Sequence, residues 1–160
     1  MPHLPDTHRE NACRENACWK NAWSLDDLAR LTRGSFIEQL GIRFVEIGAD
    51  WLTAELTIRP ATAHAGVALA LAEAIGTLAS RMAVEAGTHA VSGLDIKANH
   101  CRPVGVGETV RATARPLNLG RQTHEWEIRI QAAGDERLVC VARLTTAIKT
   151  RAGEGVRAAA

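Results

Sequence analysis

A single carboxylate, Glu73, interrupts the apolar run "HAGVALALAEAIGT" (64–77). One interpretation is a solvent-facing helical stripe, in which Glu73, Thr77 and Arg81 follow one another at the i, i+4 spacing. The other is an active-site acid, because its helical-wheel neighbours are mostly small or hydroxylated: Gly66, Leu69, Ala70, Gly76, Thr77 and Ser80. Small neighbours let a ligand or another chain approach, and a shielded acid suits nucleophilic or general-base chemistry. The helical pattern alone leaves both interpretations open.

The start of the same helix offers a second chemical group. The N–H groups of its first turn, from Ala65 and Gly66, have no intrahelical partner, and the helix dipole favours an anion beside them. Such donors can form an oxyanion hole, which stabilises a carbonyl oxygen as it becomes negatively charged. Gly66 leaves room for a substrate to approach. His64, just before the helix, is either a capping or packing residue or a functional group.

Composition excludes several other classes of function. The chain has 160 residues and a formal net charge of +1, so it has no strongly basic surface for a nucleic acid. The longest apolar segment carries Glu73, Arg81 and Glu85, which argues against a membrane span. The N-terminus "MPHLPDTHRENAC" lacks the apolar core of a signal peptide, so we expect a cytoplasmic protein.

The cysteines do not predict a metal site or a disulfide scaffold. Cys13, Cys18, Cys101 and Cys140 form no CxxC pair, so free thiols are expected. His8 lies five residues before Cys13, a spacing unlike that of paired zinc ligands. We therefore expect neither a metal nor a cofactor.

Changes of hydrophobic period divide the chain into elements. The stretches "SLDDLARL" and "SFIEQLG" carry S-x-x-D and S-x-x-E start signals, from Ser24 and Ser35, and predict two short helices. Beyond Gly41 the period becomes two, which is typical of strands, except in one long helix. The long helix is predicted over residues 65–86. The strands are predicted over residues 41–48, 51–58, 90–98, 108–117, 123–131 and 138–149.

This order of elements predicts an α+β fold. Alternating strands form an antiparallel sheet with one covered face, and a single long helix is available to cover it. The absence of β–α alternation and of a glycine-rich phosphate loop excludes a Rossmann sheet. We expect this domain to span residues 24–149, after an extension (1–23) that contains a "RENAC" repeat and before a polar tail (150–160), both mobile.

Four segments resemble, in order and spacing, the hotdog-fold acyl-CoA thioesterases. They are "HAGVALALAEAIGTLAS", "VSGLDIKANHCRP", "PLNLGRQTHEWEIRI" and "RLTTAI". The group most similar to them contains 1,4-dihydroxy-2-naphthoyl-CoA and 4-hydroxybenzoyl-CoA thioesterases. The resemblance covers residues 35–149 and implies an antiparallel sheet wrapped around a central helix. It also implies homodimers, often paired into tetramers, with active sites between subunits.

The resemblance also implies roles for individual residues. Glu73 would be the catalytic carboxylate, either as nucleophile or as the base that activates water. Thr77 would hydrogen-bond the acid or the water, and the Ala65 N–H, with Gly66 beside it, would be the oxyanion donor. His64 would hold the thioester end of an acyl-CoA substrate.

Substrate-binding residues are implied less specifically. Arg102 and Arg121 would meet the phosphates of the coenzyme, or are solvated residues at strand ends. Asn99 and His100 would line the acyl pocket, or are satisfied residues of the sheet.

The chain departs from these thioesterases in one segment. Only "RPATAH" (59–64) separates a strand from the long helix, where the family has a longer loop with a polar residue that completes the site. This leaves two hypotheses. The first is hydrolysis of an aromatic or medium-length acyl-CoA, and the second is a non-catalytic hotdog module that binds acyl-CoA or a partner.

Overall fold

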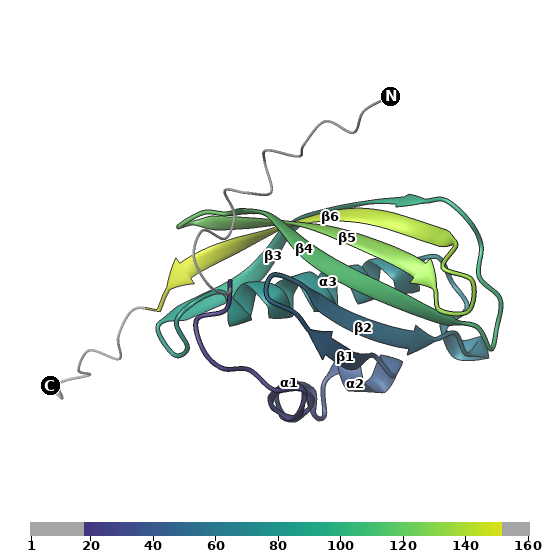
Figure 1. The fold of residues 1–160 in the computed structure, drawn as a ribbon, viewed down its shortest axis with the longest axis horizontal. Coiled ribbons are helices and arrows are strands. Elements are labelled where there is room, and N and C mark those ends of the chain that lie inside the picture. The colour runs from purple at the N-terminus through teal and green to yellow at the C-terminus, as the bar shows by residue number, and fades with distance from the viewer. Residues whose placement is uncertain (1–17, 152–160) are drawn as a thin grey trace, which may run out of the picture.

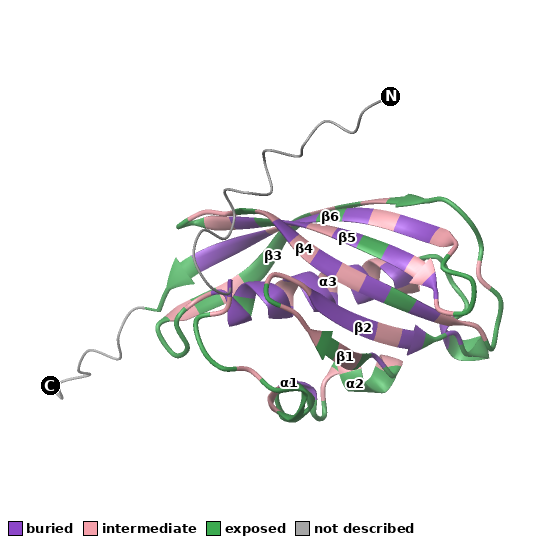
Figure 2. Cartoon of the chain, viewed as in Figure 1, coloured by how far each residue is buried: buried purple, intermediate pink, exposed green. Residues whose placement is uncertain are grey.

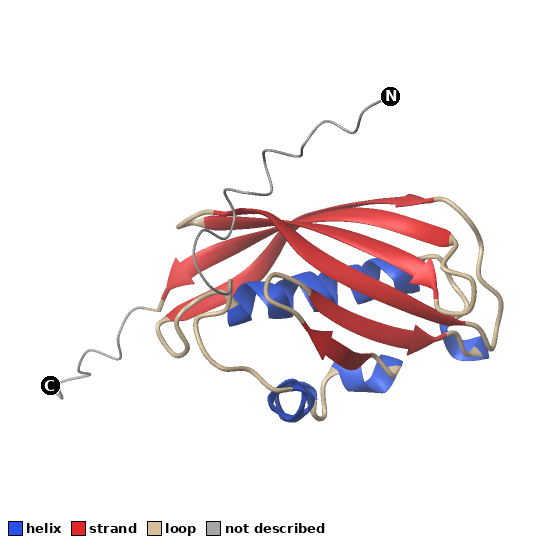
Figure 3. Ribbon diagram, viewed as in Figure 1, coloured by secondary structure: helices blue, strands red, loops and turns tan. Residues whose placement is uncertain are grey.

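The computed structural model describes residues 18–151. Its strands form one antiparallel sheet of six strands in the order β1-β2-β4-β5-β6-β3. The sheet curls over a single long helix, α3 (Gly66–Met82), and two short helices lie beside β1 (Figures 1 and 3). The strands are β1 (Arg43–Ile47), β2 (Leu52–Thr57), β3 (His89–His100), β4 (Thr109–Leu119), β5 (Thr123–Ala132) and β6 (Leu138–Thr150). The predicted α+β hotdog architecture is confirmed.

The core lies between the concave face of the sheet and α3. Alternate residues of β4 and β5 are buried, as the period of two predicted, and the colour changes along these strands show the alternation (Figure 2). In β2, Thr53 is buried in addition to the predicted Leu52, Ala54 and Leu56. From the helix, the stripe of Leu71, Ile75, Leu78 and Met82 packs against them. Trp126, on β5, is fully buried. The predictions for residues 1–17 and 152–160, which include most of the repeat and most of the tail, lie outside the described residues.

Two of the small residues assigned to the face around Glu73 belong to the core instead. Gly76 is buried, and a Cβ atom there would overlap the Leu144 side chain, so its role is to let the helix approach β6. Ser80 is fully buried and accepts a hydrogen bond from Trp126 Nε1 at 2.6 Å. The sheet wraps around the C-terminal half of α3, which a helical wheel cannot represent.

The two short helices precede the sheet. In α1 (Leu25–Thr32), Ser24 Oγ accepts the Asp27 N–H and the Asp27 carboxylate accepts the Ser24 N–H, so the predicted capping box forms. Helix α2 (Phe36–Leu40) ends at Gly41, whose φ of 83° is left-handed. Its predicted capping box is wrong, because the Ser35 hydroxyl donates to the Thr32 carbonyl and does not cap α2.

Helix α3 ends four residues earlier than predicted, at Met82. The Met82 carbonyl accepts the Lys20 N–H at 2.9 Å, so residues that precede the first helix complete the end of the third. Beside this contact, Trp19 stacks on Trp126 with ring centroids 6.3 Å apart and donates from Nε1 to the Gly48 carbonyl at 2.7 Å. Residues 18–20 therefore cover the C-terminal end of α3.

The free-thiol expectation is correct for two of the described cysteines. Cys101 is exposed and Cys140 is buried, and both are free. Cys18 is disulfide-bonded, so the expectation is wrong there. Among residues 18–151, no helix is long and apolar enough to cross a bilayer.

Candidate active site

Glu73 lies on α3 and is half-buried, so it belongs neither to the hydrophobic core nor to a fully solvent-exposed face of the helix. Thr77, one helical turn later, donates a hydrogen bond from Oγ1 to Glu73 Oε1 at 3.0 Å. The bond restrains the rotamer of the acid. The neighbouring strand β3 passes close to the carboxylate at Gly93, where a Cβ atom would stand 3.1 Å from Oε1.

Of the two N–H groups predicted as donors at the start of α3, one is bonded and the other has no partner among residues 18–151. The Gly66 N–H donates to His64 Nδ1 at 2.9 Å, so His64 caps the helix. Because Nδ1 is the acceptor, the proton of the neutral ring lies on Nε2. The Ala65 N–H has no hydrogen-bond partner among residues 18–151, and Ala65 is exposed. Of the two predicted donors, Ala65 is therefore the available one.

Gly66 makes room for a neighbouring side chain of the same turn. A Cβ atom at this position would lie 3.0 Å from His64 Nδ1. The glycine therefore makes room for the imidazole ring that caps its own N–H.

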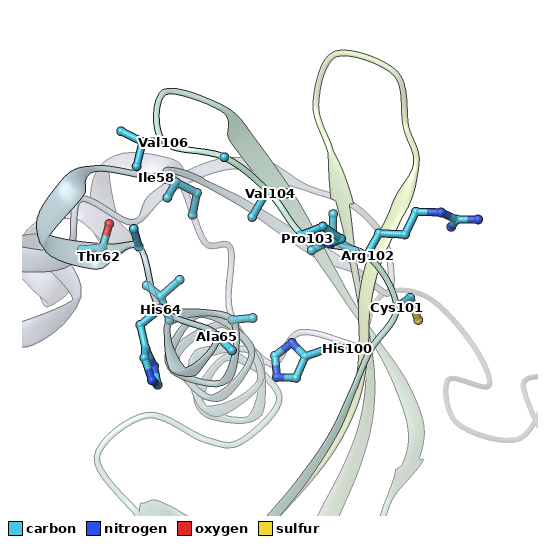
Figure 4. A pocket seen from close by; sticks show the side chains of 15 residues that line it. Ile58, Thr62, His64, Ala65, His100, Cys101, Arg102, Pro103, Val104 and Val106 are labelled. Carbon is cyan, nitrogen blue, oxygen red and sulfur yellow. The ribbon is translucent and has the colours of Figure 1, made fainter.

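A cavity of about 650 Å³ opens in front of this turn. Its walls are mainly aliphatic and come from the end of β2, the first turn of α3 and the segment after β3 (Figure 4). They include Ile58, Val67, Val104, Val106 and Val139. The polar residues in the lining include His64, His100 and Arg102, although the Arg102 guanidinium turns away from the cavity (Figure 4). An apolar space with a few polar residues in its lining is typical of a ligand site.

Of the two residues predicted to line an acyl pocket, His100 lines the cavity and Asn99 does not. His100, the last residue of β3, lines the cavity and its ring points toward the first turn of α3 (Figure 4). Its ring nitrogens have no hydrogen-bond partner among the described residues. Asn99 does not line the cavity, because successive side chains of a strand point to opposite faces.

The two predicted phosphate ligands lie at opposite ends of the sheet. Arg102 follows β3, points away from the cavity and donates from Nη1 to the Leu138 carbonyl at 3.3 Å (Figure 4). Arg121 is exposed in the turn between β4 and β5. Strand β6 measures their separation. Its residue Cys140 pairs with His100, close to Arg102, and its residue Ile148 donates to the Gln122 carbonyl, close to Arg121. Eight residues of strand span roughly 26 Å, so one chain does not bring the two guanidinium groups together.

In the short segment before His64 (59–63), both polar side chains are bonded to the backbone of the described residues. Residues Pro60–Thr62 form a 3₁₀ turn, and the Thr62 hydroxyl is bonded to the Arg59 backbone. The Arg59 guanidinium donates to the carbonyls of Gln39 and Leu40.

Glu73 and Ala65 do not meet within one chain. They are eight residues apart on one helix, and this separation corresponds to about 12 Å along its axis. A thioester carbonyl bound at the Ala65 N–H would therefore be out of reach of the same chain's carboxylate. No group of three or more His, Cys, Asp or Glu side chains in residues 18–151 could hold a metal ion.

Comparison with known proteins decides the family. Residues 61–140 match the model of the thioesterase superfamily. This chain belongs to that superfamily. The matched region contains Glu73, all the cavity-lining residues except Ile58, and strands β3, β4 and β5.

Individual relatives agree with the assignment. The 1,4-dihydroxy-2-naphthoyl-CoA hydrolase of Escherichia coli is 39% identical over 133 residues, which cover 78% of this chain and 94% of that protein. A thioesterase of Haemophilus influenzae has a solved structure with a TM-score of 0.78 and 39% identity, covering 87% of this chain and 99% of the other. A mutant thioesterase of Pseudomonas aeruginosa gives a TM-score of 0.80 and 34% identity, covering 84% and 99%.

These comparisons confirm the resemblance and the expectation of a thioester hydrolase. Gly93 is the site residue that the sequence reasoning missed. A glycine within a strand pattern indicates a close approach of another group, which was the available signal.

Proposed function

We propose that this thioesterase hydrolyses the acyl-CoA thioester of an aromatic or medium-length acyl group, with Glu73 as its catalytic carboxylate. The observation that supports the proposal best is the Thr77–Glu73 hydrogen bond on a helix whose Ala65 N–H, unbonded among residues 18–151, lies beside an apolar cavity. The Escherichia coli relative is named as a hydrolase of an aromatic acyl-CoA.

The carbonyl oxygen of the thioester would accept the Ala65 N–H, and the acyl group would occupy the apolar cavity. Negative charge develops on that oxygen in the transition state, where a preorganised donor stabilises it. The Glu73 carboxylate either attacks the carbonyl carbon, giving an anhydride that water then hydrolyses, or removes a proton from the attacking water. Both routes break the C–S bond and release a free acid and the thiol of CoA.

A second copy of the chain would complete the site. Strand β3 is an edge strand of 12 residues with one side unpaired, and its Leu94 side chain is 61% exposed. Pairing β3 with β3 around a two-fold axis gives one continuous sheet and sets the two α3 helices antiparallel. The Ala65 end of one helix then lies beside Glu73 of the other, which removes the separation of about 12 Å. We propose a homodimer, or a tetramer of two such dimers.

The same two-fold axis suits the coenzyme. It places the Arg121 end of one copy beside the Arg102 end of the other, so that cations from both copies can meet the phosphates of CoA. His100 would then face the thioester from the cavity, as a polar group with unoccupied ring nitrogens.

Substitution of the acid tests this proposal. Glu73→Gln keeps the size of the side chain and removes its charge, so we expect thiol release to fall by roughly 10²-fold or more. The rate would be measured with benzoyl-, phenylacetyl-, naphthoyl- and aliphatic CoA esters, and oligomeric state by light scattering. Glu85→Gln, an exposed site just after α3, is the matched control.

Parental turnover in Glu73→Gln would contradict the assignment of the acid. Tight binding of every ester by the parent protein, without thiol release, would instead favour the non-catalytic binding module.

A further inference from the structure

Gly93 is an unexpected residue for its position in β3. Glycine weakens a strand because it lacks a side chain that can pack and loses more conformational entropy than other residues. The backbone conformation at position 93 does not require glycine, because its φ is not positive. The reason for a glycine must therefore be the space next to it.

The Glu73 side chain occupies that space. The three atoms nearest to a Cβ at position 93 all come from Glu73: Oε1 at 3.1 Å, Cδ at 3.9 Å and Cγ at 4.0 Å. A β-bulge follows at once, because the pairing of β3 with β6 shifts between Gly93 and Asp95. Bulges bend a strand locally and are frequent next to active sites.

The two carboxylate oxygens have different surroundings. Oε1 accepts the Thr77 hydroxyl and faces the bare backbone of Gly93. Oε2 has no hydrogen-bond partner among residues 18–151. The acid is therefore held by one oxygen and free at the other.

We propose that Gly93 is a positioning residue for Glu73, and that Oε2 is the oxygen that acts on the thioester or on its water. The inference rests on the proposed function. Thr77 fixes Oε1 from the helix, and the absence of a side chain at position 93 lets the carboxylate take up that position under β3. A methyl group at position 93 would push Oε1 away by a few tenths of an ångström and turn Oε2 with it.

The experiment compares Gly93→Ala and Gly93→Val with Gly134→Ala. Position 134 is the control, since a Cβ atom there meets nothing within 4 Å. Misplacement of a reacting group by about 1 Å can cost roughly 10²-fold in rate, so we expect kcat to fall about tenfold with Ala and further with Val. KM, melting temperature and oligomeric state should match those of the control, because only the end of a flexible side chain has to move.

A double-mutant cycle separates positioning from a general effect on the strand. In a Glu73→Gln background, Gly93→Ala should leave the residual rate unchanged. Parental kcat in Gly93→Ala, an equal fold-loss in the Glu73→Gln background, or a loss accompanied by dissociation would each overturn the inference. Parental turnover in Glu73→Gln would reject the proposed function itself, whereas an inactive Glu73→Gln with a fully active Gly93→Ala rejects only the role of Gly93.

Discussion

At the scale of the residue, the backbone of Ala65 can be tested without removing a side-chain function. Its φ of −55° is close to the value that proline requires, and its N–H has no partner among the described residues. Ala65→Pro therefore deletes the donor with little change in backbone shape. Loss of one oxyanion donor costs about 10²- to 10³-fold in kcat, which we expect in a thiol-release assay.

The control for this prediction is Ala65→Val. It adds similar bulk at an exposed position and keeps the N–H. A proline variant as active as the valine variant would show that another group stabilises the carbonyl oxygen.

At the scale of the element, β5 carries a histidine that makes the fold sensitive to acid. His124 is 4% exposed, and its Nδ1 has no hydrogen-bond partner in the part of the chain described. Burial lowers the pKa of His124 from 6.5 to about 4, so the folded chain keeps the ring neutral while the unfolded chain binds the proton first. This contribution to stability is complete above about pH 6.5 and is lost between 6.5 and 4.

The loss amounts to roughly 3.5 kcal/mol at most, from about 1.4 kcal/mol per pKa unit. Urea unfolding across this pH window would measure it. His124→Leu should flatten the dependence, although carboxylates such as Asp27, whose pKa the Ser24 hydrogen bonds lower to about 2, still titrate below it. Equal slopes for parent and variant would exclude a buried neutral histidine.

At the scale of the whole molecule, two inactive variants should complement each other. If each site takes Glu73 from one copy and the Ala65 N–H from its partner, a heterodimer of Glu73→Gln with Ala65→Pro contains one intact site. Random mixing of equal amounts gives heterodimers in half of the dimers, so roughly a quarter of parental activity should return. Mixing after reversible unfolding, followed by the thiol-release assay, measures this recovery.

The matched control is the same procedure with each variant alone, which should stay inactive. Absence of recovery, with heterodimers shown by mass spectrometry of differently tagged chains, would place both groups of a site in one copy.

Local patterns predicted most of the fold. The alternation in β4 and β5 and the apolar stripe of α3 follow from residue periods, because neighbours along the chain determine which face is apolar. The predictions failed where distant segments intervene. Lys20 completes the end of α3, and the enclosing sheet buries Gly76 and Ser80. None of these contacts is encoded in a helical wheel.

In the candidate site, too, some residues could be predicted from the sequence and others only from the tertiary structure. Glu73, Thr77 and the first turn of α3 could be selected from the sequence, since their relative positions depend only on the regular rise and rotation of one helix. The tertiary structure decided the rest: Gly93 lies against Oε1, His100 turns into the cavity while Asn99 turns out, and Arg102 lies far from Arg121. These relations depend on strand register and sheet curvature, which arise from contacts between residues that are distant in the chain.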